Sequence, residues 1–150
     1  MKIKSFGKIQ KSKIQLLEKK IGFKLPVDYA LFLENNNGGV IEHYQTFFVK
    51  ELGQDVILDV LFGIEREHRG LDLSFWFDEK KDDLPEKSLV IGKDPGGNFI
   101  LLVNSKDNKG IYYWGANGFF LTATSTEEKN TYLIDFSFTK FINELKPFNG

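Results

Sequence analysis

The sequence predicts an α+β fold in a single domain that spans residues 1–150. Two helix-like segments come first, strand-like segments follow, and an amphipathic segment lies near the C-terminus. Separate runs of helices and strands are typical of α+β domains. The 41% hydrophobic content, with fifteen phenylalanines, is sufficient for one sizeable core in 150 residues. We therefore expect an N-terminal αα-hairpin, a mostly antiparallel sheet of about five to six strands, and a C-terminal helix packed on that sheet.

The αα-hairpin is predicted from two segments between residues 12 and 39. Ser12 and Gln15 have the spacing of a capping box, which starts a helix whose apolar residues recur on one face. Gly22 can end this helix in the left-handed conformation. Pro26 fits the first turn of a second helix, because that turn needs no N–H group from it. The sequence "NNNGG" should stop this second helix at Gly38 and Gly39.

The sheet is predicted from six runs that are rich in β-branched and aromatic residues, most of them bounded by Gly, Asn or Asp. Short connections between most of the runs favour antiparallel pairing. A longer insert at residues 65–87 interrupts the series, and "LDLSFWFDE" within it could form a short helix. The six runs cover residues 46–50, 55–64, 88–92, 98–104, 110–115 and 119–124.

The stretch "VIGKDPGGNFILLV" resembles a phosphate-binding loop at first sight. A Walker loop, however, needs Gly-Lys-Ser/Thr between a strand and a helix, whereas here the lysine precedes the glycines and a strand follows. A proline in second place followed by Gly96 and Gly97 is typical of a reverse turn. We therefore expect this segment to join two strands as a hairpin.

The C-terminal helix is predicted from Ser137 as its cap and from apolar residues at helical spacing. Pro147 follows the end of that pattern. The apolar residues are Phe138, Phe141, Ile142 and Leu145.

Composition excludes several classes of function. The chain has no cysteine, which removes disulfides, thiolate nucleophiles and cysteine-based zinc sites. No apolar run approaches the roughly 20 residues that span a membrane, and the N-terminus is not a secretory signal. We expect a cytoplasmic protein that binds neither a membrane nor a small-molecule substrate. The first 24 residues carry eight lysines against Glu18, but no nucleic-acid-binding motif accompanies them, so we expect no direct contact with nucleic acid.

The densest polar cluster is "EREHRGLD" at residues 65–72, which holds both arginines of the chain. One histidine with nearby carboxylates is a weak metal signature, and no serine lies in a nucleophile elbow. We therefore expect no metal, no cofactor and no catalytic residue. The simplest interpretation of the cluster is a solvated, salt-bridged connection, and a surface for a protein partner is the next. The hypothetical partner-binding residues are Glu65, Glu67, Asp72, Trp76, Asp78, Glu79, Asp82 and Asp83, with Trp76 as an aromatic anchor if it is exposed.

Taken together, the segments resemble the SUKH superfamily, which includes bacterial immunity proteins and Smi/Knr-type regulators of fungal cell-wall assembly. The resemblance lies in "IQLLEKKIGFKLPVDYALFLENNNGG", "DLPEKSLVIGKDPGGNFILL", "GIYYW" and "SFTKFINEL", in the family's order, and it covers nearly the whole chain. The matching positions are turns, caps and core residues. The cluster at residues 65–72 is not part of the matching pattern.

The resemblance implies an immunity protein, that is, an antitoxin that binds and neutralises a cognate protein toxin. Toxins paired with this family are often nucleases or deaminases, and the net charge of −8 beyond residue 24 suits a basic partner of this kind. A non-immunity regulatory or adaptor module of the Smi/Knr type is the alternative. A small enzyme that uses the cluster at residues 65–72 is a third possibility, which activity lost on changing His68 alone would favour.

Overall fold

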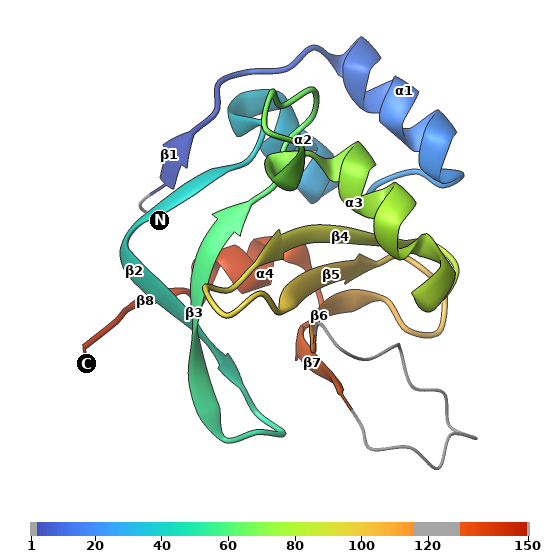
Figure 1. Cartoon of the computed structure of the whole chain (residues 1–150). Coiled ribbons are helices and arrows are strands. Elements are labelled where there is room, and N and C mark those ends of the chain that lie inside the picture. The colour runs from blue at the N-terminus through green and yellow to red at the C-terminus, as the bar shows by residue number, and fades with distance from the viewer. Residues whose placement is uncertain (1–2, 116–129, 150) are drawn as a thin grey trace.

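The structure is a computed structural model that describes residues 3–115 and 130–149 (Figure 1). It has four α-helices and two short 3-10 helices in these residues, and its strands form one sheet. The helices are α1 (Lys11–Ile21), α2 (Val27–Asn36), α3 (Leu73–Lys80) and α4 (Phe138–Asn143), with 3-10 turns at Arg69–Leu71 and Lys81–Asp83. The strands are β1 (Ile3–Ser5), β2 (Gly39–Val49), β3 (Gln54–Leu61), β4 (Ser88–Lys93), β5 (Phe99–Val103), β6 (Gly110–Trp114), β7 (Thr131–Asp135) and β8 (Lys146–Pro147).

The sheet follows the chain. Its order is β1 to β7 in sequence, every neighbouring pair is antiparallel, and β8 pairs with β2. The antiparallel α+β architecture was predicted, but the sheet has more strands than the five to six expected. The additional strands β1, β7 and β8 are short and lack a long apolar run, so only their pairing partners mark them as strands. The run predicted at residues 119–124 lies outside the described residues.

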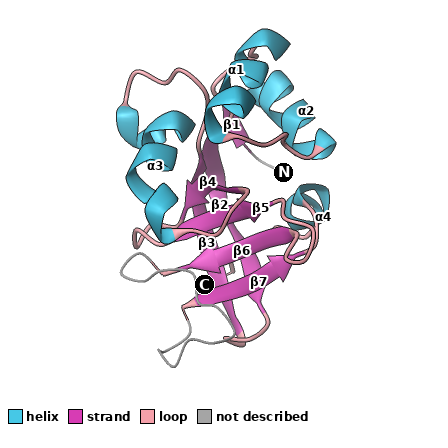
Figure 2. Ribbon diagram, turned by 90° about the vertical axis from the view of Figure 1, so that its right-hand side faces the viewer, coloured by secondary structure: helices cyan, strands magenta, loops and turns pink. Residues whose placement is uncertain are grey.

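The sheet is curled, which brings strands together that are distant in its order. Phe47 of β2 contacts Tyr113 of β6, with 5.7 Å between the ring centroids, although three strands separate β2 from β6. Phe47 also meets Phe141 of α4 at 5.6 Å. In Figure 2, α1 and α2 lie above the strands, α3 lies at the left and α4 at the right. The core therefore lies between the curled sheet and the helices that cover it.

The two ends of the first helix have different caps. Ile14, Leu17 and Ile21 form its buried face, and Gly22 ends it with φ 85°, in the left-handed region where glycine has no steric penalty. The capping box predicted at Ser12 is wrong, because the helix begins at Lys11 and Ser12 lies inside its first turn. The N-cap residue, Gln10, makes no side-chain capping bond. The difference of one or two residues is within the usual variation of helix boundaries.

The second helix differs from the prediction at both ends by one or two residues. Pro26 is the N-cap, with extended backbone (φ −55°, ψ 145°), and the helix starts at Val27. Asn37, with φ 49°, is the left-handed cap at the other end, so the helix stops before the glycines. Asparagine tolerates this conformation better than other non-glycine residues. Both helices are present, and their packing as an αα-hairpin stays a prediction.

The C-terminal helix has the predicted cap but ends at Asn143, so the predicted position Leu145 lies beyond it, and the glycine turn forms as expected. Ser137 caps α4 by accepting a hydrogen bond from the backbone N–H of Lys140 at 3.1 Å. Phe138 and Phe141 of α4 are buried against the sheet and α2. The turn between β4 and β5 reverses the chain with a strand on either side, and its positive φ lies at Gly97 (87°) rather than at Gly96.

Candidate functional site

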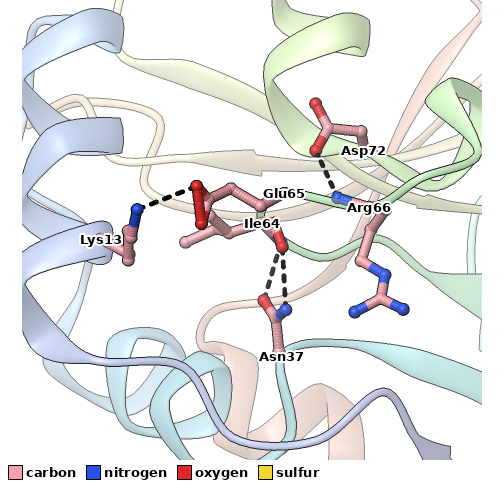
Figure 3. Close-up of polar contacts among 6 residues, drawn as sticks. All are labelled: Lys13, Asn37, Ile64, Glu65, Arg66 and Asp72. Atoms are coloured by element: carbon pink, nitrogen blue, oxygen red, sulfur yellow. Dashed lines mark hydrogen bonds and ion pairs between the residues drawn. The ribbon is translucent and has the colours of Figure 1, made fainter.

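The loop after β3 is held in place by a buried asparagine. Asn37 is 3% exposed, and its amide makes two hydrogen bonds with the backbone of Ile64 (Figure 3). The Oδ1 atom accepts from Ile64 N at 2.7 Å, and Nδ2 donates to Ile64 O at 2.9 Å. The amide bonds to both backbone groups of Ile64, as a residue of a paired strand would. The end of α2 therefore fixes the backbone of Ile64, directly before the polar cluster.

The polar cluster at residues 65–72 is a closed loop. Gly63 and Leu71 join its base, since Gly63 N donates to Leu71 O at 3.0 Å. The carboxylate of Asp72 accepts from Arg66 N at 3.1 Å and from Phe75 N at 3.1 Å, and the second bond caps α3. His68 Nδ1 accepts from Gly70 N at 3.1 Å within a 3-10 turn. Asp72 and His68 thus shape the loop through backbone bonds.

Lysines of α1 reach across to this loop and to α3. Lys13 Nζ lies 3.0 Å from a carboxylate oxygen of Glu65, and Lys20 Nζ lies 2.8 Å from one of Asp78. Lys20 also donates to the hydroxyl of Ser74. All four charged side chains are about 40% exposed or more, so solvent screens these pairs and each contributes at most about 1 kcal/mol. Their main effect is to neutralise two of the acidic residues that the sequence suggested for a partner.

A groove of about 430 Å³ lies between α1, the loop and the start of α3. Its apolar part comes from Leu16, Leu17 and Ile64, and Leu16 is 61% exposed. Its charged part contains four basic and two acidic residues. The full lining is Lys13, Leu16, Leu17, Lys20, Ile64, Glu65, Arg66, Arg69, Asp72 and Ser74. The groove is therefore net positive on its charged side, next to an apolar floor.

The two arginines of the groove have no carboxylate partner among residues 3–115 and 130–149. The Arg66 guanidinium lies 4.4 Å from the ring centroid of Phe6, and that of Arg69 lies 5.4 Å from that of Phe75. The Nε atom of Arg66 is buried and has no hydrogen-bond acceptor there. Both positive charges thus rest on aromatic rings and remain available to an anion.

Trp76 of α3 packs against other aromatic residues of the fold. Trp76 is partly buried, its ring stacks on Phe62 at 5.8 Å, and its Nε1 donates to Gly70 O at 2.8 Å. It also contacts Phe75 and Phe99 at 5.1 and 5.0 Å between centroids. Trp76 was expected to anchor a partner only if its side chain is exposed. It is partly buried, so that condition is not met.

The structure divides the eight predicted partner-binding residues into separate groups. Glu65 and Asp72 line the groove, Asp78 is paired with Lys20, and Trp76 packs inward. The remaining four are exposed and make no ion pair within the described part of the chain: Glu67, Glu79, Asp82 and Asp83. Sequence reasoning did not connect the lysines of α1 with this site. Their spacing, with Lys13, Leu16, Leu17 and Lys20 at i, i+3, i+4 and i+7, is the signal that they share one helix face.

No group of three or more His, Cys, Asp or Glu side chains in the described residues is arranged to hold a metal ion. No helix in the same part of the chain is both long and apolar enough to cross a membrane. The described residues present an open charged groove beside exposed carboxylates of α3.

The family follows from comparison with known proteins. Residues 8–144 match the model of the SMI1 / KNR4 family (SUKH-1), and the chain belongs to this family. The family includes immunity proteins, and its members are generally non-enzymatic immunity or regulatory proteins. The chain is also similar to the SPbeta prophage-derived uncharacterized protein YokK of Bacillus subtilis (strain 168). The two are 29% identical over 143 residues, which cover 79% of this chain and 71% of the relative.

Proposed function

We propose that this protein is an immunity protein that binds and neutralises a cognate toxin domain in the cytoplasm. The observation that carries the proposal is its membership of a family that includes immunity proteins. The prophage origin of its relative is compatible with this role. Neutralisation by a bound protein needs a stable surface and no chemistry of its own.

The exposed acidic residues of α3 and the turn after it would supply the toxin-facing charge. Glu79, Asp82 and Asp83 are exposed and have no ion-pair partner in the described residues, whereas Asp78 is held by Lys20. A nuclease or deaminase carries a basic surface for nucleic acid, and unpaired carboxylates opposite such a surface accelerate association. We therefore assign the first contact with the toxin to Glu79, Asp82 and Asp83.

The test begins with the toxin domain encoded by the gene next to this one. Co-expression with the protein should restore growth of cells that produce the toxin domain, and the two proteins should copurify as a stoichiometric complex. Absence of both rescue and complex, with a folded protein, would refute the immunity function. A stable complex with a protein that harms no cell would favour the regulatory or adaptor function, which the same family supports.

A charge-reversal variant tests the surface itself. Changing Glu79, Asp82 and Asp83 to Lys should lower the association rate by at least roughly tenfold at low salt and have little effect at high salt. The matched control changes Glu42, Asp55 and Asp107 to Lys, because these residues are also exposed but belong to β2, β3 and the turn after β5. Equal rates for the two variants would place the toxin elsewhere without affecting the result of the rescue experiment.

A further inference from the structure

The groove beside α1 is net positive, whereas the exposed face of α3 is acidic. The groove should therefore bind a different kind of ligand. We propose that it binds an acidic peptide segment of a partner protein, with a Glu or Asp side chain against Arg69 and Arg66 and a neighbouring apolar side chain on Leu16. The inference does not rest on the partner being a toxin, because a regulatory partner could present the same segment.

Charge accounting within the groove supports an anionic ligand. Glu65 is neutralised by Lys13, and both carboxylate oxygens of Asp72 accept backbone N–H groups. Arg66 and Arg69 have no carboxylate partner in the described residues. A guanidinium offers several donors in a planar fork that matches a carboxylate. The groove therefore contains positive charge that the rest of the described structure does not compensate.

The apolar floor of the groove favours a peptide over a free anion as the ligand. Leu16 is 61% exposed beside Leu17 and Ile64, although the other apolar positions of α1 are buried. A small phosphate ion would leave this floor in water. A peptide with an acidic and an apolar side chain would cover the floor and pair the arginines at the same time.

Binding can be followed by NMR at the two arginines themselves. The chain has two arginines, so the arginine Nε–Hε region of the spectrum contains two signals. The probe is a capped peptide of alternating Leu and Glu, and the control probe has Gln in place of each Glu. We expect the Glu peptide to shift the Arg69 signal and the Arg66 signal saturably, and the Gln peptide to leave both in place. Titration with inorganic phosphate alone forms the third arm.

Three variants give effects of different sign. Arg69→Gln should weaken binding of the Glu peptide by roughly fivefold or more, because it removes a charge-assisted bond. Glu65→Gln should strengthen binding, because it removes a negative charge from the lining and frees Lys13. Lys106→Gln, an equal loss of positive charge on the exposed turn after β5, should leave binding unchanged. A gain from Glu65→Gln cannot result from misfolding, and the melting temperature of each variant verifies the fold.

Several outcomes would overturn the proposal. These are equal shifts with the Gln peptide, weaker binding with Glu65→Gln, or the same loss with Lys106→Gln as with Arg69→Gln. Phosphate that binds as tightly as the Glu peptide and displaces it would make the groove an anion site rather than a peptide site. None of these results bears on toxin rescue, which the proposed function predicts separately.

Discussion

Gly22 and Gly38 have nearly the same φ angle but very different surroundings. Their φ angles are 85° and 80°, in the region that L-residues with a side chain rarely adopt. A Cβ atom at Gly22 would meet nothing within 4 Å. A Cβ atom at Gly38 would overlap the backbone carbonyl groups of Leu61 and Phe62. The second glycine is therefore required for close backbone approach as well as for its conformation.

This difference gives a matched pair of variants. Gly22→Ala should lower the free energy of unfolding by about 1–2 kcal/mol, which is the cost of the left-handed conformation alone. Gly38→Ala should cost clearly more, about 3 kcal/mol or above, because the β2 start must also move away from β3. Urea denaturation of the two variants measures the difference. Equal losses would show that the backbone of Leu61 and Phe62 yields without cost.

Asn37 supports a second prediction at the level of one residue. Asn37→Ala removes both hydrogen bonds to Ile64 and leaves a buried N–H and C=O without partners. We expect a loss of about 2–4 kcal/mol in the free energy of unfolding. Asn36→Ala is the control, since the only bond of its side chain to another described residue is a long one, 3.4 Å, to Phe32 O. A loss at Asn37 no larger than at Asn36 would contradict the role of the buried amide.

Asp28 shows how one side chain joins two elements. Its Oδ2 accepts from both the backbone N–H and the hydroxyl of Thr139, each at 2.9 Å, so it ties the start of α2 to the first turn of α4. Phe138 completes the junction, since its ring meets Tyr29 of α2 at 4.9 Å. The carboxylate of Asp28 and the ring of Phe138 thus join the C-terminal helix to α2.

Asp28→Ala should therefore lower the free energy of unfolding by about 1–2 kcal/mol. Asp107→Ala, a loss of an equal charge at an exposed turn, should change it by less than about 0.5 kcal/mol. Thermal unfolding followed by circular dichroism compares the two. If both variants melt with the parent, the bonds to Thr139 contribute nothing net.

The elements show which features a sequence can predict. Helices and long strands were predicted from periodicity and turn residues, because their own residues carry the signal. Strand β2 starts at Gly39, seven residues before the predicted Thr46, and its first part includes His43 and Tyr44 with positive φ. A bulge between Val40 and Gln45 breaks the alternation of that part, so no sequence rule marked it as a strand.

The candidate site was less predictable than the fold. The polar cluster at residues 65–72 was identified as a surface, but its charge was interpreted from residues adjacent in sequence. The lysines that neutralise Glu65 and Asp78 come from α1, 52 and 58 residues away. Electrostatic pairing over such a separation depends on the tertiary arrangement, which composition and local spacing do not contain.

At the scale of the whole molecule, stability should depend on pH through Asp135. Burial and a hydrogen bond with Glu144 raise the pKa of Asp135 to about 6, and the charge of Lys140 opposes this. The pKa in the unfolded chain is near 3.8. The folded state therefore binds more protons between these values, so its stability falls as pH rises from about 4 to about 6 and stays lower above that range.

Asp135→Asn should flatten this dependence and leave the protein at least as stable as the parent at pH 7.5. Asp55→Asn, at an exposed position of β3, should keep the slope of the parent. Urea denaturation at pH 4, 5, 6 and 7.5 gives the four points. An unchanged slope in Asp135→Asn would assign the dependence to another group.

The order of the sheet also determines how the chain can fold. Each strand from β1 to β6 pairs with the strand that follows it, so most of the sheet can form by pairing strands in chain order. Two pairings join segments that are far apart in the sequence: β1 joins residues 3–5 to 39–41, and β8 joins Lys146 and Pro147 to Thr46 and Gln45. Closing a loop of about 100 residues costs more entropy than closing a hairpin. We therefore expect the β2–β8 pairing to form last and open first, and the amide of Phe148, which donates to Tyr44 O at 2.7 Å, to exchange with deuterium well before those of β4 and β5.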